Sequence, residues 1–519
     1  MDRKPPSELS NLDRHLLLAT KGGGIVLAGK LFTYGSRLVT VLILARLLAA
    51  EQYGQYNLSL NMVEVLAAMS SFGLHMALVR FIPVFVGRND PAGLWGTLRV
   101  CMGTTAGLSL LLAVGLYSNA GAVAGHLFHD ARVAPLLRVI SVFLPFYALN
   151  DSIAAATRGF KKMHYTTIAQ FVCHPLVKLG LILALALTGL SCTTALVAAG
   201  VTEVVVTVIL VFFLRKLLRP HATPESPRYE TGTILRYSLP AYLSDLLSEF
   251  SGSIQVLFVG ALSTATQAGV YALTAAVARL SQLFQRSIAM SAEPIVSEMF
   301  NRNSKKEFAG FYQTMTKWTL ALNLPVFLIL VLLPGPILKL FGETFAGGAA
   351  ILWLFATERM FHVSTGMCGV VLNMSGRTDL KLANTVVQIS VLTVLNYFLI
   401  PRWGAYGAAL AVSVAGIAEH MLRLVEIGVL YRVLPYNAGF LRTIAAGVMA
   451  TVAGLLVGRW LPPGQSVLNT ATAALAILAS YAGGTALMGL TREEHVILRR
   501  AKNRASALLA RLPVSAAVR

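Results

Sequence analysis

Two cations stand seven residues apart in a strongly apolar segment near the amino terminus, GGGIVLAGKLFTYGSRLVTVLILARLL (Gly22 to Leu48). Lys30, Thr33, Arg37 and Thr40 follow helical spacing, so they form one polar stripe. A cation at the centre of a membrane helix costs about 2.5–3.5 kcal/mol on insertion scales, and no acid occurs in this segment. The chemistry that such a stripe offers is anion binding, because guanidinium groups bind phosphates bidentately.

A second set of charges follows from an internal repeat. Laying the second half of the chain over the first at an offset of 215 residues matches LLAAEQYGQY with LSTATQAGVY. The same offset places Lys30 opposite Asp245 and Glu64 opposite Arg279, so the charges are exchanged between the halves. We therefore predict two parallel repeats of six spans, related by an axis along the membrane normal.

The charged positions of both halves define a candidate anion site. At a rise of about 1.5 Å per residue, Arg37 and Arg279 lie roughly at mid-membrane, whereas Lys30 and Arg286 lie roughly 10 Å inside the inner boundary. Two interpretations of the nearby acids stay open: they only pair with these cations, or they take part in ion coupling. The predicted substrate-binding residues are Lys30, Arg37, Lys178, Arg279 and Arg286, and the predicted coupling or charge-balance residues are Glu64, Asp245 and Glu249.

Other buried charges are interpreted as structural. Arg423 has Glu419 and Glu426 on the same helical face, so it is neutralised locally. The neighbouring pair Glu358 and Arg359 is assigned to packing in the same way.

Composition places all these residues in a membrane protein. Of 519 residues, 56% are hydrophobic and 13% charged, and the mean hydropathy is +0.67; soluble domains carry about 25% charged residues. The net charge of +20 does not indicate nucleic-acid binding, because no soluble basic domain is present. The four cysteines lack CxxC spacing, so no metal site is predicted. The sequence contains no GxxxxGK[ST] loop, so no ATPase is predicted, and no cofactor is expected.

Hydropathy predicts about fourteen spans, an even number that places both termini on one side. The segments on that side hold 27 lysine and arginine residues against 5 on the other, so that side is predicted to be cytoplasmic. The predicted organisation is a cytoplasmic N-terminal segment (1–22), an N-lobe of six spans (23–214), a cytoplasmic linker (215–232), a C-lobe of six spans (233–431), two extra spans (438–489) and a basic amphipathic cytoplasmic tail (490–519).

Short motifs in a fixed order add a family resemblance. They include ILARLLAAEQYGQYNL after the first span, TRGFKKMHY after the fourth, GVYALTAAVARL opening the eighth, ILKLFGETFAGGA before the tenth and WGAYGAALAVSV entering the twelfth. Together they resemble the Wzx-type polysaccharide and oligosaccharide flippases of the multidrug/oligosaccharidyl-lipid/polysaccharide exporter superfamily, over roughly the whole chain through span 12.

The resemblance implies an all-α polytopic membrane protein with two pseudo-symmetric six-helix lobes around a central cavity, lined by spans 1, 2, 7 and 8, and two extra helices. It implies alternating-access transport of an undecaprenyl-diphosphate-linked glycan across the bacterial inner membrane, for cell-surface polysaccharide such as lipopolysaccharide or exopolysaccharide. The implied partners are this glycan, membrane lipids, and the polymerase and glycosyltransferases of the same pathway. Related transporters couple to Na⁺, H⁺ or the membrane potential, and no motif here selects among these.

Two other functions are weighed against this one. A cation-coupled multidrug exporter needs an acidic or apolar cavity, which the lining cations oppose. A membrane glycosyltransferase or polymerase needs a large extramembrane loop or a catalytic acid cluster, and the predicted outer connections are short. The sequence therefore predicts a transporter and not an enzyme.

Overall fold

The structure is a computed structural model that describes residues 11–220, 226–236, 238–239, 242, 252–301, 305–460 and 467–488. The predicted site residues Asp245 and Glu249 and the predicted basic tail lie outside these residues. The side chains of Lys30 and Arg286 also lie outside the described part.

All described elements are helices, which confirms the all-α prediction. Eight of the described helices are long and apolar enough to cross a membrane, or nine if the bent pair α4 and α5 is one span. Two of the eight are kinked and each divides into two, which is consistent with about fourteen spans. The chain is therefore a multi-pass membrane protein.

The amino-terminal half of the chain comprises α1 to α8. Its elements are α1 (Asn11–Ser71), α2 (Leu74–Gly87), α3 (Pro91–Ala122), η2 (Val123–Leu127), α4 (Val133–Ser141), α5 (Leu144–Gly159), α6 (Met163–Thr166), η3 (Thr167–Cys173), α7 (His174–Thr188) and α8 (Cys192–Leu218).

The carboxyl-terminal half comprises α10 to α17, and two further helices follow it. The elements are α10 (Ser253–Leu262), α11 (Ala265–Ala278), η4 (Arg279–Gln282), α12 (Leu283–Asn301), α13 (Lys305–Leu332), α14 (Pro334–Lys339), η5 (Glu343–Gly348), α15 (Ala349–Ser364), α16 (Cys368–Met374), α17 (Thr378–Tyr431), α18 (Ala438–Trp460) and α19 (Val467–Leu487).

Two long helices are divided by single residues with positive φ. Ala49, at φ 55°, divides α1 into an amino-terminal arm and a carboxyl-terminal arm. Gly404, at φ 53°, divides α17 three residues after Pro401, which lacks the N–H that a continuous helix needs. Each division turns one long helix into two membrane spans.

A third break corrects a boundary expected from hydropathy. Residues 57–82 form one apolar run and predict one continuous span, but α1 ends at Ser71 and α2 begins at Leu74. Gly73 has φ 68°, and a Cβ atom there would lie 2.4 Å from the carbonyl oxygen of Ser238. A close backbone approach from the other half of the chain therefore requires a glycine at this break, and hydropathy carries no signal of it.

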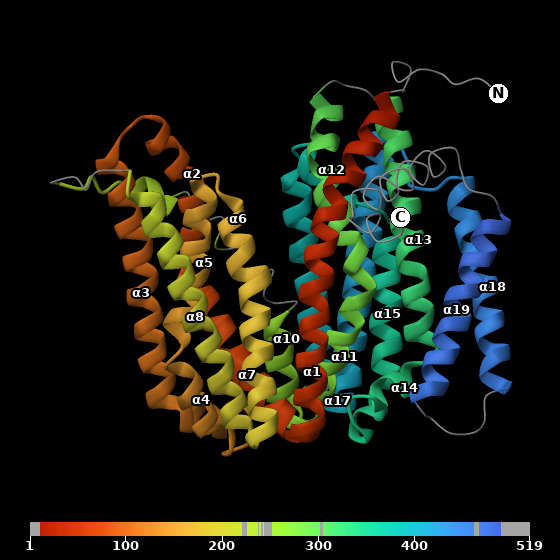
Figure 1. The fold of residues 1–519 in the computed structure, drawn as a ribbon, viewed down its shortest axis with the longest axis horizontal. Helices are drawn as coiled ribbons and strands as arrows, with labels where there is room; N and C mark the ends of the chain where they lie inside the picture. The colour runs from red at the N-terminus through yellow and green to blue at the C-terminus, as the bar shows by residue number, and fades with distance from the viewer. Residues whose placement is uncertain are drawn as a thin grey trace, which may run out of the picture.

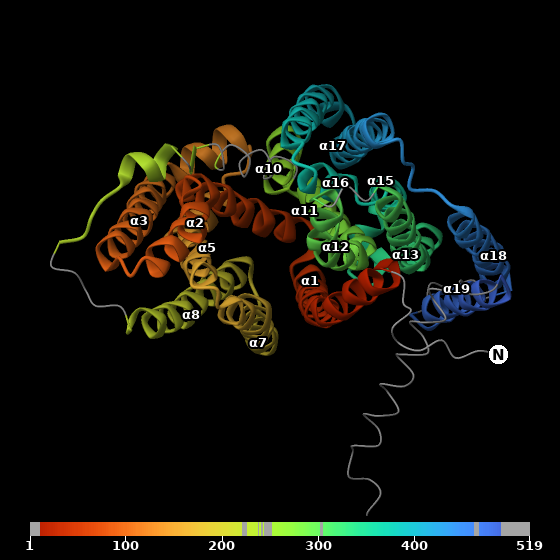
Figure 2. The ribbon, with the colours of Figure 1, turned by 90° about the horizontal axis from the view of Figure 1, so that it is seen from above.

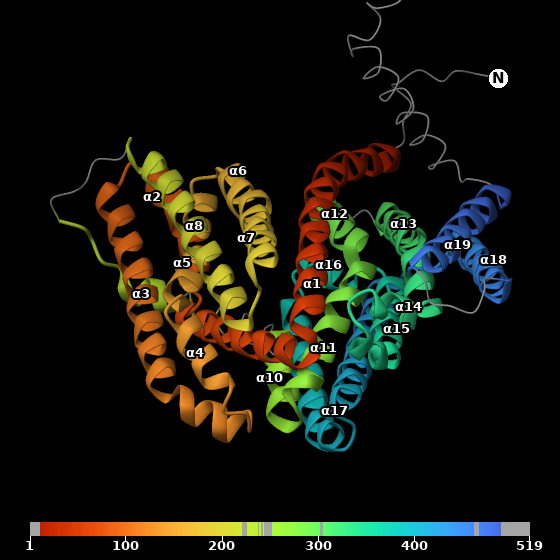
Figure 3. The same cartoon turned by 60° about the horizontal axis from the view of Figure 1, so that its bottom comes forward.

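The two halves lie side by side and diverge toward one end. In Figure 1, α2 to α8 form one group and α11 to α15 the other, with α18 and α19 flanking the second group. Figure 3 shows the groups meeting at one end and separated at the other. Seen from above, the amino-terminal arm of α1 lies between α7 and α12 (Figure 2), and α1 contacts α7, α11 and α12.

At the closed end the halves touch backbone to backbone. A Cβ atom on Gly54 would lie 1.7 Å from the carbonyl oxygen of Ala265, and one on Gly269 would lie 2.3 Å from that of Ala50. These residues are two pairs at the repeat offset of 215, so the contact is reciprocal, as a two-fold arrangement requires.

The open end carries the connections α2–α3 and α5–α6 (Figure 1). The sequence predicts these connections to be cytoplasmic. The closed end is then the predicted outer side.

Candidate functional site

A cavity of about 440 Å³ lies between the two halves. Its wall comes from both arms of α1, from α5, α7 and α8 of the first half, and from α10, α11, η4, α15 and α17 of the second. Because these are membrane-crossing segments, polar residues on this wall are withdrawn from lipid.

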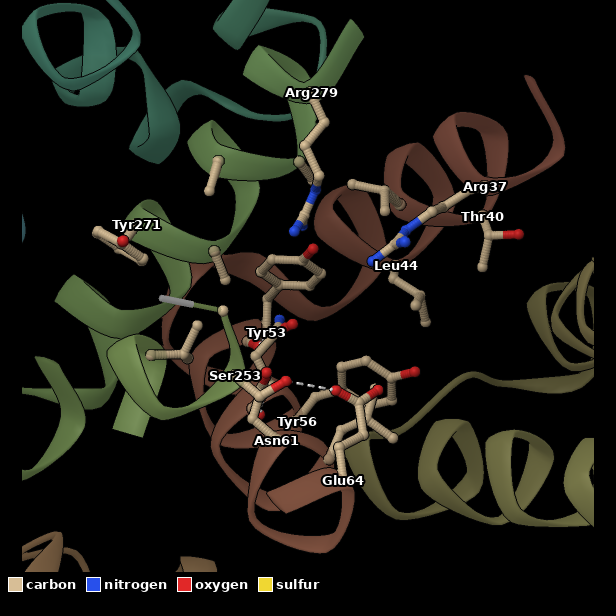
Figure 4. Close-up of a pocket in the computed structure, with 18 of the residues that line it drawn as sticks. Arg37, Thr40, Leu44, Tyr53, Tyr56, Asn61, Glu64, Ser253, Tyr271 and Arg279 are labelled. Atoms are coloured by element: carbon tan, nitrogen blue, oxygen red, sulfur yellow. Dashed lines mark hydrogen bonds between the residues drawn. The ribbon is translucent and has the colours of Figure 1, made fainter. Parts of the chain in front are cut away.

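Arg37 and Arg279 enter the cavity from different halves. Arg37 lies on the polar stripe of the amino-terminal arm of α1, and Thr33 and Thr40 of that stripe line the same cavity. Arg279 begins η4, directly after α11. Figure 4 shows both guanidinium groups pointing into the cavity toward Tyr53. Among the described residues, no carboxylate oxygen lies within 4.0 Å of either group.

Two further cations line the cavity, one from each half. Lys178 lies on α7, four residues after His174 and therefore on the same helical face. Arg359 lies on α15, and its Nε is 3.1 Å from Oε2 of the neighbouring Glu358. The described wall thus holds four cationic side chains.

Two carboxylates, Glu64 and Glu203, face the same cavity, and neither is paired with a lysine or arginine among the described residues. Ser253 Oγ donates to Glu64 Oε2 at 2.9 Å, a bond that joins the two halves (Figure 4). Asn150 Nδ2 donates to Glu203 Oε2 at 2.6 Å, and His174 Nε2 lies 2.9 Å from Glu203 Oε1. The cations therefore outnumber the acids, and the acids do not cancel them by direct ion pairing within the described wall.

Tyrosine hydroxyls add neutral hydrogen-bonding groups. Tyr53, Tyr56, Tyr147 and Tyr271 line the cavity. The buried hydroxyl of Tyr56 has no hydrogen-bond partner among the described residues. A buried polar group without a partner costs about 1–3 kcal/mol, so this hydroxyl is well suited to bind a ligand.

Four of the predicted site residues meet in this cavity: Arg37, Lys178, Arg279 and Glu64. Lys30 lies two helical turns before Arg37 in α1. Arg286 lies in the first turns of α12. Nothing is observed of their side chains.

Sequence reasoning missed Arg359, Glu203 and His174. Assigning Arg359 to packing was incomplete, because the residue does pair with Glu358 but also lines the cavity. Glu203 and His174 are 29 residues apart and carry no pattern that links them. An acid in an otherwise apolar span, which α8 contains at Glu203, was the one available signal.

Within the described residues, no group of three or more His, Cys, Asp or Glu side chains is placed to hold a metal ion. His126, His129 and Asp130 have a spacing in the sequence that could suit a metal ion, but Asp130 is held by neighbouring side chains. Asp130 accepts hydrogen bonds from Gln55 Nε2 at 2.8 Å and Arg132 Nε at 2.9 Å.

Comparison with known sequences gives partial matches to three proteins. The probable low-salt glycan biosynthesis flippase Agl15 of Haloferax volcanii is 24% identical over 187 residues, covering 35% of this chain and 39% of that protein. The uncharacterized membrane protein YabM of Bacillus subtilis is 28% identical over 352 residues, 62% of this chain and 64% of its own. The succinoglycan biosynthesis transport protein ExoT of Rhizobium meliloti is 29% identical over 146 residues, 28% of each chain. The chain thus matches less than two thirds of the length of each of these relatives.

Solved structures share the fold at low sequence identity. Lipid II flippase MurJ in an inward closed conformation matches with a TM-score of 0.71 at 14% identity, over 89% of this chain and 98% of MurJ. A multidrug resistance MATE family transporter in an inward-facing conformation matches at 0.63, with 15% identity over 78% of this chain and 98% of that one. At such identities the likeness establishes the fold alone.

Two family models match the chain itself. The MatE model matches residues 240–398, within the second half. The model described as polysaccharide biosynthesis protein matches residues 19–300, more than half of the chain. The protein therefore belongs to the polysaccharide biosynthesis protein family of the multidrug/oligosaccharidyl-lipid/polysaccharide exporter superfamily, as the resemblance of its motifs predicted.

Proposed function

We propose that the protein is a flippase that carries a polyprenyl-diphosphate-linked oligosaccharide from the cytoplasmic to the outer leaflet by alternating access. The observation that carries this proposal is the cavity itself. It lies between two membrane-embedded halves, and its described wall holds four cations and two carboxylates. A diphosphate has to cross a low-dielectric slab, and fixed guanidinium groups replace the water that stabilises its charge.

Different residues of the wall suit different parts of the proposed substrate. Arg37 and Arg279, which have no carboxylate within 4.0 Å in the described residues, are the first candidates for the diphosphate. Tyr56, Asn57 and Asn61 offer hydroxyl and amide groups to sugar hydroxyls. We infer that the polyprenyl chain stays in the bilayer, because a cavity of about 440 Å³ holds a polar head group and not a long lipid tail.

We infer transport from the cytoplasmic to the outer leaflet, and the end at which the two halves separate supports this direction. The open end carries the connections predicted to be cytoplasmic, so we interpret the structure as the loading state. We infer a location in the bacterial inner membrane with both termini in the cytoplasm, next to the glycosyltransferases and polymerase of the same pathway.

The energy source is proposed to be Na⁺, H⁺ or the membrane potential, with Glu64, Asp245 and Glu249 as the acids that couple or balance charge. Glu64 is well placed for this role because its bond to Ser253 joins the two halves and has to break when they move.

A cation-coupled multidrug exporter is the second candidate, and the MatE match to residues 240–398 favours it. A cationic drug would enter a cavity in which cations outnumber carboxylates, so the electrostatics favour the glycan flippase.

Surface glycan display tests the proposal. Arg37→Ala combined with Arg279→Ala should abolish display while the protein remains inserted, because two of the four described cations are removed. The matched control is Arg442→Ala, which removes an exposed cation of α18 outside the cavity and should leave display intact. Normal display in the double variant would overturn the proposal, and drug resistance without glycan display would favour the exporter.

A further inference from the structure

A buried ion pair forms the partition between two cavities in the carboxyl-terminal half. The side chain of Glu358 is 4% exposed, and its Oε2 lies 3.1 Å from Nε of Arg359. Oε2 has no hydrogen-bond donor among the described residues, so Arg359 is the group that compensates its charge. Arg359 lines the central cavity and also a second cavity of about 520 Å³.

The second cavity offers a polar route to this pair. It is lined by α12, α15, α16 and α17, and its polar residues include Glu293, His362 and Lys381. His362 stacks on His420 of α17, with ring centroids 3.8 Å apart. His420 Nε2 in turn lies 3.9 Å from Glu358 Oε1. Two imidazoles therefore connect the second cavity to a carboxylate that is otherwise enclosed.

Among the surrounding charged groups, Arg359 is the one that compensates the negative charge of Glu358. On α17, Arg423 is paired with Glu419, so that couple is neutral by itself. Lys317 of α13 packs against Gly439 of α18. The charged and titratable groups around Glu358 are Arg359 and His362 on α15, Tyr271 on α11, Arg279 on η4, and Glu419, His420 and Arg423 on α17.

We propose that Glu358 is a proton-binding site, reached from the second cavity through His362 and His420, and that its protonation frees Arg359 for the anionic substrate in the central cavity. The proton comes from solvent in the second cavity and ends on a carboxylate oxygen of Glu358; the stacked rings of His362 and His420 have to reorient for an imidazole nitrogen to carry it there. The carboxylate becomes a neutral acid, and the positive charge of Arg359 is then compensated by the substrate. This inference rests on the proposed anionic substrate.

Anion binding and protonation of Glu358 are expected to strengthen each other. A buried carboxylate that loses a paired guanidinium is strongly disfavoured, so drawing Arg359 toward an anion favours protonation of Glu358. By reciprocity, protonation of Glu358 strengthens anion binding by the same factor. Anion binding should therefore take up a proton and tighten as the pH falls.

Calorimetric titration of the purified full chain with farnesyl diphosphate measures this linkage. Titrations in two buffers with different ionisation enthalpies give the number of protons taken up per anion bound. Between about pH 8 and about pH 6, the wild type should gain up to about tenfold in affinity per pH unit beyond the change that the ligand's own titration causes. Glu358→Gln, which mimics the neutral acid, should show only the ligand's change and bind at high pH as the wild type does at low pH.

The control is Glu426→Gln, the same substitution on α17 at a carboxylate held by Asn384 Nδ2 at 2.7 Å; it should keep the wild-type proton uptake. If Glu358→Gln does not yield folded protein, Arg359→Gln provides the same test, because it should also lose the proton uptake. His420→Phe should leave the equilibrium uptake unchanged and slow the proton-linked phase in stopped-flow mixing.

The outcomes separate the two proposals. Binding of farnesyl diphosphate with equal proton uptake in wild type and Glu358→Gln would overturn the proton site and leave the flippase proposal standing. Absence of binding to the wild type at every pH would overturn the anionic substrate, and the proton site with it.

Discussion

Gly54 and Gly269 lie back to back where the two halves of the chain meet. A Cβ atom on Gly54 would lie 1.7 Å from Ala265 O, and one on Gly269 would lie 2.3 Å from Ala50 O. Each glycine touches the repeat equivalent of the residue that the other touches. This contact closes the cavity at the predicted outer side and leaves no room for a side chain.

Gly54→Ala should therefore open the outer side. Overpacking of this kind should destabilise the state in which the halves touch by about 1–3 kcal/mol relative to the state in which they are apart. The measurement is labelling of Asn57→Cys by a membrane-impermeant maleimide from outside, in a background without the four native cysteines. Labelling should rise in Gly54→Ala and stay low in Gly121→Ala, where an added Cβ meets nothing within 4 Å. Equal labelling in both variants would contradict a closed state held by this contact.

Glu64→Gln should strengthen anion binding without breaking the bond between the halves. The glutamine oxygen still accepts from Ser253 Oγ, but one of the two described negative charges of the cavity is gone. At an effective dielectric constant near 20 this is worth on the order of tenfold in affinity for farnesyl diphosphate.

Ser253→Ala distinguishes the effect of the Glu64 charge from the effect of its hydrogen bond to Ser253. It removes the donor and keeps the carboxylate, so the affinity for farnesyl diphosphate should change by less than about threefold. Weaker binding in Glu64→Gln than in wild type would mean that Glu64 itself takes part in holding the substrate.

The ionised carboxylate of Asp90, at the open end, should stabilise the fold, and this stabilisation should be lost at low pH. It caps α3 by accepting from the Gly93 amide at 2.9 Å, and it pairs with Arg228 Nη2 at 2.7 Å. The Gly93 hydrogen bond first, and Arg228 next, hold the pKa of Asp90 below its usual value. A lowered pKa means that the stabilisation is complete above the unfolded value of about 3.9 and is lost as the pH falls through the folded value.

Asp90→Asn keeps a cap and removes this titration, because asparagine caps helices as well as aspartate does. The Tm of the wild type should exceed that of Asp90→Asn near neutral pH, and the difference should shrink as the pH falls below the unfolded pKa of about 3.9. A difference that stays constant across this range would exclude the ionised carboxylate as its source.

The sequence predicted those parts of the site that depend on one helix or on the repeat. Arg37 was identified because Thr33 and Thr40 share its face, and Arg279 because the offset of 215 sets it opposite Glu64. Both residues line one cavity, and their role in substrate binding stays a prediction. Lys178 was identified only as a cation without a local acid, and it lines the same cavity.

The parts that escaped prediction depend on contacts between distant segments. Arg359 is adjacent to an acid in sequence, which satisfies a local rule, and only the packing of α15 against the cavity reveals its second role. The break at Gly73 depends on the backbone of Ser238, 165 positions later in the numbering. Neither hydropathy nor helical spacing contains such information.

Transport by the purified protein in liposomes tests the central claim most directly. The substrate is a polyprenyl-diphosphate-linked oligosaccharide. The readout is the fraction of glycan that a lectin added outside the vesicles binds over time. We expect wild-type protein to equilibrate the glycan between leaflets and the combined Arg37→Ala and Arg279→Ala variant to remain near the rate of empty vesicles. Equal rates for wild type and empty vesicles, or equal rates for wild type and the double variant, would contradict a flippase that works through this cationic cavity.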